Sequence, residues 1–490
     1  MKPDDLFDRG QEWSDLETFA TSPARGLRVG AVSGRRRLGK SFLLRRLARD
    51  LGGLYHVALE EESGPALQRF ADSLGTQQGL RPGQLRMNDW GEALQAALSS
   101  TAPLLILDEL PYLLAQPLGA TIPSALQALV DASRDHREAA PKRVIVCGSS
   151  LSVMSELLSG AKPLRGRADL DLQLRPFDYR TTADFYGIRD PGVAFRLYAV
   201  LGGVPGYRDL LAEASPQTDD ELDELIRATV GNPSHALFGE PTYLLREDPR
   251  ITDRALYYSI LQAIGAGATT PSKVAAAIGR DVRGLAHPLD VLLSAGFIRR
   301  TDDLLLDRRP TLRVADPIVR FHDLVIRPRL TAFEERRSEP AWRDAQSTIR
   351  SHVLGPAFED LAREWVTRYS SPATLGGEPG EVGATVLNDA AGRSQHQLDV
   401  VVLAAGQRRR PPRPKVIAIG EAKDSDRGRT ADDIARLEKG RDLLAARGVD
   451  TTDCKLLLFG RSGFEGDLHQ IAERRGDIEL IDLERIRSGA

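Results

Sequence analysis

The stretch from Leu27 to Leu47, LRVGAVSGRRRLGKSFLLRRL, restricts the fold of this chain more than any other. Its apolar start predicts a buried strand, a glycine-bounded loop follows, and the rest has the apolar spacing of a helix. The loop fits G-x-x-x-x-G-K-S, in which Gly34 and Gly39 let backbone N–H groups turn toward phosphate oxygens. Lys40 would reach the β- and γ-phosphates, and Ser41 would hold Mg²⁺ at the positive end of the helix. The sequence therefore predicts a nucleotide site.

Length and composition limit the class of protein. A chain of 490 residues exceeds one ordinary domain and predicts about three or four. Its 41% hydrophobic and 28% charged residues are typical of a globular protein, and the net charge of −3 confines any nucleic-acid contact to local basic patches. No apolar run approaches the roughly twenty residues of a membrane span, and the acidic N-terminus predicts no export signal. We expect a cytoplasmic protein, with Cys147 and Cys454 as buried thiols.

A second strong motif is LLILDELPYLL, from Leu104 to Leu114. Two adjacent acids after an apolar run are tolerated at the C-terminal end of a buried strand. There Asp108 would hold Mg²⁺ through water, and Glu109 would polarise the attacking water. We interpret the pair as a Walker B element with a catalytic glutamate. Strands alternating with helices around it predict a parallel sheet with the site at the strand ends.

Three further places are candidates for nucleotide contact, each with a structural alternative. Arg9 would lie on the adenine side, although packing of its helix on the sheet edge is the favoured interpretation. Ser149 or Ser150, after a buried strand, would sense the γ-phosphate or form a turn. Either Arg165 or Arg167 would stabilise transition-state charge, in its own subunit or a neighbouring one, or belong to a basic surface loop.

Together these motifs resemble the archaeal-type P-loop ATPases, a branch near the STAND and AAA+ NTPases. The resemblance covers most of residues 5 to 335 and rests on GRRRLGKS at 34–41, LILDELPYLL at 105–114, GSSLSVMSELLSG at 148–160, PLRGR at 163–167 and LGGVPGY at 201–207. It implies an ASCE-type ATPase core that uses ATP and Mg²⁺, followed by a helical lid. Arg165 departs from the family, which has an aromatic residue there, whereas Arg167 matches the family's arginine and is favoured.

The middle of the chain is helical, and residues 255–316 then predict three helices and a hairpin, the elements of a winged helix. The third helix is poorly supplied with basic residues, so we do not expect it to read bases. The hairpin is better supplied and is a candidate for phosphate contact, although an internal packing module is an equal alternative. Its basic residues are Arg299, Arg300, Arg308 and Arg309.

The C-terminal third holds a second group of chemistry-bearing residues. QLDVVVLA opens a strand with Asp399, and VIAIGEAKDSD places Glu421 and Lys423 two apart, on one face of the next strand. Two carboxylates and the Ala422 carbonyl make an oxygen-only set suited to Mg²⁺, and the lysine would orient water or neutralise phosphate charge. Glu359 lies beside the apolar stripe of the preceding helix.

This constellation resembles the restriction-endonuclease-like, PD-(D/E)xK nuclease superfamily. The resemblance implies that Asp399 is the aspartate, that Glu421 and Lys423 are the E-x-K pair, and that Glu359 is the helix acid, with Mg²⁺ or Mn²⁺ as the metal. An ordinary strand pair with solvated charges is the alternative, because D…ExK recurs by chance in charged chains. The basic turn at 408–410 is a further candidate for phosphate contact.

We therefore predict an α/β multidomain protein. Its predicted parts are a P-loop ATPase core (1–182), a helical lid (183–247), a winged-helix domain (248–335) and a PD-(D/E)xK nuclease-like domain (336–490). The predicted function is an ATP-regulated, Mg²⁺-dependent nuclease in defence or DNA repair, with DNA favoured over RNA and homo-oligomerisation left open. The alternatives are a STAND-like switch that binds nucleic acid or protein without cutting, and a DNA-translocating motor.

Overall fold

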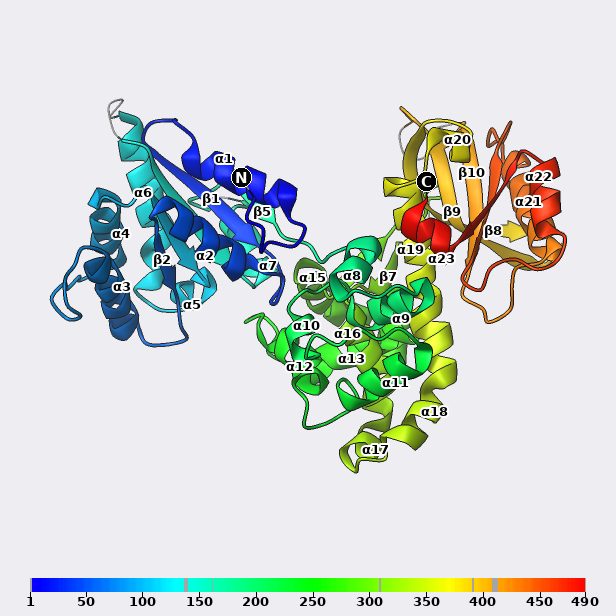
Figure 1. Cartoon of the computed structure of the whole chain (residues 1–490), viewed down its shortest axis with the longest axis horizontal. Coiled ribbons are helices and arrows are strands. Elements are labelled where there is room, and N and C mark those ends of the chain that lie inside the picture. Colours follow the sequence, from blue (N-terminus) through cyan, green and yellow to red (C-terminus); the bar gives the residue numbers. More distant parts are fainter. Residues whose placement is uncertain are drawn as a thin grey trace. The chain divides into compact units, whose positions relative to one another are not determined.

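The computed structural model describes residues 2–135, 140–160, 162–307, 310–389, 392–407 and 413–489 (Figure 1). The chain forms two compact units. Unit 1 comprises Met1–Pro176, Val204–Tyr207 and Thr242–Thr252, and unit 2 comprises Phe177–Gly203, Arg208–Pro241 and Asp253–Ala490. The predicted lid is thus divided between the two units, while the four-domain description stays a prediction.

Unit 1 contains a five-stranded sheet in the order β2-β3-β4-β1-β5, and every neighbouring pair is parallel. This confirms the predicted α/β class with a parallel sheet, in which β4 separates the P-loop strand β1 from the acid-bearing strand β3. The strands are β1 (Leu27–Ser33), β2 (Leu54–Val57), β3 (Leu104–Asp108), β4 (Lys142–Gly148) and β5 (Ala168–Gln173).

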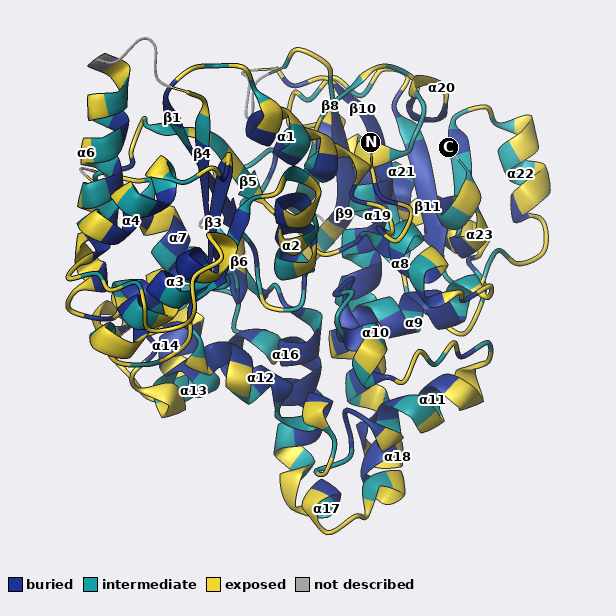
Figure 2. Cartoon of the chain, turned by 60° about the vertical axis from the view of Figure 1, so that its left-hand side comes forward, coloured by how far each residue is buried: buried dark blue, intermediate teal, exposed yellow. Residues whose placement is uncertain are grey.

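Helices cover both faces of this sheet. Val29 and Ala31 of β1 belong to a core that includes Phe70 and Trp90. Gly30 faces the other side of the sheet, where a Cβ added to it would lie 3.1 Å from the ring of Phe19. The inner strands of both sheets are mostly buried, as Figure 2 shows, whereas the edge strands β5 and β8 (Pro379–Asp389) are largely not. The helices of unit 1 are α1 (Gly10–Thr21), α2 (Lys40–Leu51), α3 (Ser63–Gln77), α4 (Trp90–Ser99), α5 (Leu110–Leu114), α6 (Ile122–Asp135) and α7 (Leu151–Leu157).

The middle of the chain is helical, as expected. Three helices, α13, α14 and α15, precede the antiparallel hairpin β6–β7, and these are the elements from which the sequence predicted a winged helix. The bounds are α8 (Tyr179–Tyr186), α9 (Pro191–Leu201), α10 (Tyr207–Leu210), α11 (Asp219–Ala228), α12 (Ala236–Arg246), α13 (Arg254–Gly265), α14 (Pro271–Ile278), α15 (Ala286–Ser294), β6 (Ile298–Thr301), β7 (Thr311–Val314), α16 (Pro317–Phe321), α17 (Leu330–Glu334) and α18 (Ser338–Thr348).

A second five-stranded sheet, in the order β12-β11-β10-β9-β8, ends unit 2. Strands β8, β9 and β10 are antiparallel neighbours, whereas β10, β11 and β12 run parallel. Its elements are α19 (Gly355–Arg368), α20 (Pro372–Leu375), β8 (Pro379–Asp389), β9 (Ser394–Ala404), β10 (Val416–Lys423), α21 (Ala431–Ala445), β11 (Lys455–Gly460), α22 (Leu468–Arg474), β12 (Ile478–Asp482) and α23 (Leu483–Ser488).

Helices α19 and α21 lie on opposite faces of this second sheet. Trp365 of α19 makes an edge contact with Phe459 of β11, with ring centroids 6.0 Å apart. The neighbouring Leu458 instead belongs to the core that contains Ile434 and Leu437 of α21. Because successive side chains of a strand alternate between faces, the two helices cover different sides.

A buried arginine of the central strand binds the end of the first helix. Arg143 of β4 is 1% exposed, and its guanidinium donates to carbonyl oxygens that include those of Phe19, in the last turn of α1, and of Ser22 and Ala24 just after it. These carbonyls lie where α1 leads into β1 and would otherwise lack partners away from water. The arginine therefore fastens α1 to the sheet.

We expect Arg143→Met to lower the free energy of unfolding by roughly 3 kcal/mol, because it leaves several buried carbonyls without donors. Denaturant unfolding followed by circular dichroism measures the change. The control is Arg28→Met, since Arg28 is 41% exposed and its pair with Asp169 is solvated, so its loss is worth under about 1 kcal/mol. Equal losses in the two variants would contradict the role given to Arg143.

Candidate functional site

The predicted P-loop joins β1 to α2. Gly34 has φ +152°, and a Cβ on it would lie 2.8 Å from the carbonyl oxygen of Leu174, so only glycine fits. Gly39, with φ +90°, immediately precedes the first turn of α2. Lys40 is 4% exposed, and its Nζ donates across the loop to the carbonyl of Arg35 at 3.1 Å. Lys40 therefore binds a carbonyl of its own loop, and a phosphate oxygen would replace this carbonyl as the acceptor.

A tyrosine links the two predicted Mg²⁺ ligands. Tyr55 of β2 donates its hydroxyl to Oδ2 of Asp108, whose Oδ1 accepts from the backbone N–H of Glu109 at 3.0 Å. Burial, followed by the hydrogen bond with Asp108, raises the pKa of Tyr55 well above its usual range, and a hydrogen bond with Ser41 opposes that rise. Ser41 and Asp108 thus adjoin one phenol, and their hydroxyl and carboxylate oxygens suit Mg²⁺. The sequence analysis missed Tyr55, because a tyrosine in a short strand carries no motif.

The predicted catalytic glutamate and the predicted sensor serine are in contact. Oε2 of Glu109 accepts hydrogen bonds from the backbone N–H and the hydroxyl of Ser149, at 3.2 and 3.0 Å. Glu109 itself has φ +55°, a conformation that side chains rarely adopt and that places it at the turn between β3 and α5. Ser149 therefore orients this carboxylate at the ends of two adjacent strands.

The two predicted arginines have partners within the domain. Arg9 is 5% exposed, pairs with Glu12 at 2.9 Å and donates to the carbonyl of Arg175 at 2.7 Å. Arg167 forms a two-pronged pair with Asp131 of α6, at 3.2 and 3.0 Å. Both contacts hold the domain together, and the nucleotide roles of the two arginines stay predictions.

Two short segments from farther along the chain pack on the P-loop. The N–H of Gly206, in the LGGVPGY motif, donates to the carbonyl of Arg37 at 3.0 Å, and a Cβ on Gly206 would lie 2.7 Å from Cβ of Arg37. Arg36 forms an ion pair with Glu247 at 2.7 Å. The loop that the sequence defined locally is therefore supported by residues some 170 to 210 positions away.

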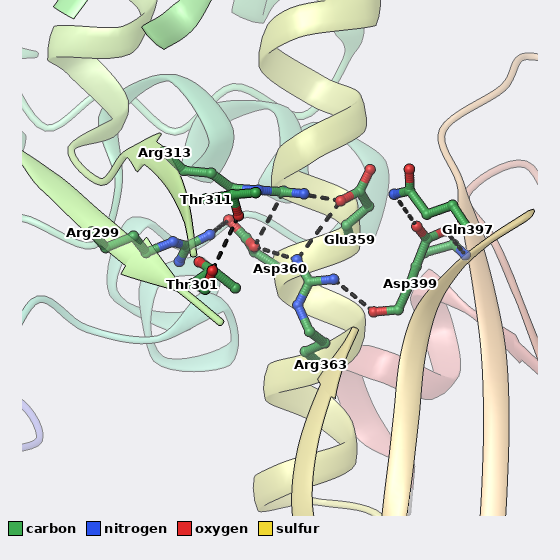
Figure 3. A network of polar contacts seen from close by, with 10 residues as sticks. Arg299, Thr301, Thr311, Arg313, Glu359, Asp360, Arg363, Gln397 and Asp399 are labelled. Carbon is green, nitrogen blue, oxygen red and sulfur yellow. Dashed lines mark hydrogen bonds and ion pairs between the residues drawn. The ribbon is translucent and has the colours of Figure 1, made fainter. Parts of the chain in front are cut away.

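In unit 2, Asp399 lies against β10 and faces α19 (Figure 3). Its Oδ2 accepts from the N–H of Ala422 at 3.0 Å, and its Oδ1 accepts from Gln397 at 2.8 Å. Burial and the negative charge of Glu359 raise the pKa of Asp399 to about 6, while its hydrogen bonds act in the opposite direction. Glu359 in turn pairs with Arg313 at 2.9 Å. The predicted aspartate and helix acid therefore share one environment.

Glu421 and Lys423 share a face, as predicted, but it is the face toward α21. The two oxygens of Glu421 pair with Arg429 at 3.2 Å and with Arg436 at 3.0 Å. Lys423 lies 3.9 Å from Asp433, which also pairs with Arg429 at 3.1 Å. Arg429 is 1% exposed, so these ion pairs form part of the packing between β10 and α21.

The predicted metal set of Asp399, Glu421 and Ala422 is not assembled in this arrangement. Across the parts of the chain that the structure describes, no three His, Cys, Asp or Glu side chains are grouped so as to hold a metal ion. Both oxygens of Glu421 already accept from guanidinium groups, and Asp399 has its partners on the opposite helix. A divalent ion therefore does not fit these residues as they lie, in contrast to the P-loop. The reason is local, since a register shift in the pairing of β8 with β9, between Gly383 and Thr385, alters which face the β9 side chains take.

The remaining sequence expectations have mixed outcomes. Cys147 and Cys454 are free and buried, which confirms the predicted thiols. Arg299 pairs with Asp360 and Arg300 with Asp302, so these hairpin arginines are bound within the chain, whereas Arg308, Arg309 and the 408–410 turn lie outside the described residues. In the described parts of the chain, no helix has the length and apolar character needed to cross a membrane.

Three features define a P-loop ATPase domain: a parallel sheet with a P-loop after its first strand, a buried aspartate at the end of β3, and next to it a glutamate held by a serine that follows β4. In agreement, residues 6–189 match the family model of an ATPase domain predominantly from Archaea. The N-terminal part of the chain is thus an archaeal-type ATPase domain.

Three archaeal proteins are similar to larger parts of the chain. An uncharacterized protein of Methanocaldococcus jannaschii, MJECL04, is 25% identical over 340 residues, which cover 68% of this chain and 72% of that protein. The Walker-type ATPase PABY2304 of Pyrococcus abyssi is 19% identical, with a TM-score of 0.47, over 66% of this chain and 97% of that structure. The Aeropyrum pernix ORC2 protein, in ADPNP–ADP complexes, is 14% identical, with a TM-score of 0.46, over 69% and 97%.

We expect Ser149→Ala to lower kcat for ATP hydrolysis about 10-fold or more with little change in KM, because Glu109 loses the hydroxyl donor that orients it and keeps only the backbone N–H, while ATP keeps its contacts. Glu109→Gln should lower kcat by about 100-fold or more while ATP still binds. Steady-state phosphate release and binding of a fluorescent ATP analogue measure both. A Ser149→Ala variant in which only KM rises would contradict the orienting role.

We also expect the raised pKa of Asp399 to appear in stability. The unfolded carboxyl ionises near pH 4 and the folded one near pH 6, so the free energy of unfolding falls by about 3 kcal/mol as pH rises between these values. Asp399→Asn removes this loss. The melting temperature of the variant, relative to that of the wild type, should therefore rise between pH 4 and pH 7. Glu473→Gln, at an exposed position of α22, is the control, and a parallel pH course for all three proteins would contradict the assignment.

Proposed function

We propose that the protein is an ATP-driven switch, in which binding and hydrolysis of ATP in unit 1 control the binding of nucleic acid by unit 2. The observation that carries the proposal is the contact between Glu109, which follows β3, and Ser149, which follows the adjacent strand β4. A carboxylate held in a fixed position by hydrogen bonds is suited to activate a water molecule. Unit 2 supplies a separate set of exposed basic residues.

The chemistry proposed for unit 1 uses its own side chains in order. Lys40 would exchange the carbonyl of Arg35 for a phosphate oxygen of ATP, and the loop N–H groups would bind the remaining oxygens. Mg²⁺, when bound by Ser41 and Asp108, would neutralise charge on the β- and γ-phosphates. Glu109, kept in position by Ser149, would orient and polarise the attacking water. Release of phosphate would then return Lys40 to its loop carbonyl.

The nucleic-acid contact is proposed for helices rather than for the hairpin. Lys273 of α14, together with Arg280 and Arg283 between α14 and α15, is exposed, whereas Arg299 and Arg300 are held in ion pairs. Exposed lysine and arginine on adjacent turns suit phosphate contacts, which position a protein without reading bases. Consistent with the sequence prediction, we favour DNA over RNA as the partner and a cytoplasmic site of action, with homo-oligomerisation left to experiment.

A second candidate function is Mg²⁺- or Mn²⁺-dependent cleavage of nucleic acid by unit 2. The observation that favours it is the 3.0 Å hydrogen bond from Ala422 to Asp399, which makes the D and E-x-K motifs neighbours on paired strands. We rank it second, because Arg429 and Arg436 occupy both oxygens of Glu421. We infer that any cutting would first require Glu421 to leave these arginines.

The switch predicts that duplex DNA is bound with an affinity that depends on the nucleotide. Fluorescence anisotropy with a labelled duplex should give dissociation constants at least about 5-fold apart between the ADP state and a non-hydrolysable ATP analogue. Lys40→Ala should remove that difference, and joint Arg280→Gln and Arg283→Gln changes should weaken binding and reduce its salt dependence by about two phosphate contacts. The matched control is Arg300→Gln. Equal affinities in both nucleotide states would overturn the switch.

Supercoiled plasmid incubated with Mg²⁺ or Mn²⁺, with and without ATP, separates the two candidates. Binding without new ends supports the switch alone. Nicking or linearisation that is lost in Asp399→Ala, retained in Asp432→Ala and accompanied by normal ATP turnover would establish the nuclease instead. Asp432 is an exposed acid on α21 and serves as the matched control.

A further inference from the structure

Unit 2 contains a pocket of about 410 Å³ that belongs to neither acidic site. Its walls come from α9, the hairpin β6–β7, α16 and α19. The charged side chains that line it are Arg299, Arg320, Arg363, Arg368, Asp360 and Glu364. Four guanidinium groups therefore face two carboxylates, which leaves the lining with an excess of positive charge.

One of these arginines, Arg320, has no direct ion-pair partner in the described parts of the chain, and the carboxylates of Asp360 and Asp316 only partly offset the effect of its burial. Arg320 of α16 is only 9% exposed, and in the described parts of the chain it forms no ion pair. Its Nε is buried without a hydrogen-bond partner, and its one hydrogen bond runs from Nη2 to the carbonyl of Ala199 at 3.5 Å. Burial lowers the pKa of Arg320. A buried guanidinium without a partner is costly, so this position favours an anion that the protein itself does not supply.

Acids of α19 and Asp178 hold the other arginines, and Figure 3 shows Asp360 between Arg299 and Arg363. Asp360 pairs with Arg299 and, at 2.6 Å, with Arg363. Arg368 lies 3.4 Å from Glu364 and 3.3 Å from Asp178. These pairs fix the direction of three guanidinium groups, whereas Arg320 has an unpartnered donor, Nε, and only one long hydrogen bond.

We propose that this pocket binds a phosphate monoester, with Arg320 as the principal ligand-binding residue. A guanidinium presents paired N–H donors that match two oxygens of one phosphate, and it remains charged where a lysine would lose its proton. The volume is that of a small-molecule site, so the ligand is either a free phosphate ester of about mononucleotide size or the phosphorylated end of a polynucleotide. The site is separate from the P-loop and does not depend on the proposed switch or on cleavage.

The test uses the full chain with its P-loop saturated by ADP and Mg²⁺, so that phosphate probes report only on unit 2. Isothermal titration is carried out with inorganic phosphate, with a 5′-phosphorylated single-stranded oligonucleotide and with the same oligonucleotide lacking the phosphate. The variants are Arg320→Met and, as the matched control, Arg300→Met on the hairpin, where the side chain is 60% exposed.

We expect the wild type and Arg300→Met to bind the phosphorylated probes alike. Arg320→Met should bind them about 10- to 100-fold more weakly, the loss expected for a charge-assisted hydrogen-bonded pair, and should be at least as stable as the wild type without phosphate, because an unpaired buried charge has been removed. Affinity greater for the phosphorylated oligonucleotide than for inorganic phosphate identifies a polynucleotide end, and equal affinity identifies a small ester.

No phosphate-dependent heat in the wild type, or unchanged affinity in Arg320→Met, overturns the site. If Arg320→Met fails to fold, Arg320→Lys decides, since it keeps the charge but not the paired donors. The site predicts about 10-fold weaker phosphate binding by Arg320→Lys with a normal melting temperature. Affinity equal to that of the wild type would show that Arg320 does not grip the ligand.

Discussion

A buried carboxylate on a strand needs hydrogen-bond donors from its neighbours, and each sheet of this chain supplies them to one aspartate. In unit 1, Asp108 receives the Tyr55 hydroxyl and the N–H of Glu109. In unit 2, Asp399 receives the N–H of Ala422 and the amide of Gln397. Each oxygen of these two carboxylates thus accepts a hydrogen bond from an uncharged donor.

The two sites differ in the kind of donor that each acid receives. Glu109 accepts only from the neutral N–H and hydroxyl of Ser149, and neutral hydrogen bonds are readily exchanged for water or a ligand. Glu421 accepts from two arginines, one of them fully buried, and breaking a buried charge pair costs several kcal/mol. The P-loop centre is therefore ready for its ligand, while the acids of the second sheet serve packing in this conformation.

The parts of the structure that follow from local spacing could be predicted from the sequence. The strand, loop and helix around Gly34 to Ser41, the acid-tipped strand at Asp108 and the parallel sheet all result from short-range patterns. The face of the sheet on which the Asp399 side chain lies could not be predicted, because it depends on a register shift in the pairing of β9 with β8. A register shift of one residue moves a side chain to the opposite face of the sheet. Tyr55 and Gly206 also escaped prediction, since their roles arise only from contacts between distant segments.

Unit 1 consists of three separate segments of the chain, and this affects how the unit can be excised. The chain leaves this unit after Pro176, returns at Val204–Tyr207 and again at Thr242–Thr252, and each return packs on the phosphate loop or stays within the same compact unit. An excised fragment that stops near residue 180 would lack the backbone that supports Arg37 and the carboxylate that holds Arg36. A proteolytic cut between residues 183 and 203 would break the covalent link from residues 1–176 to both returning segments, and a cut between residues 208 and 241 would break the link to Thr242–Thr252 alone.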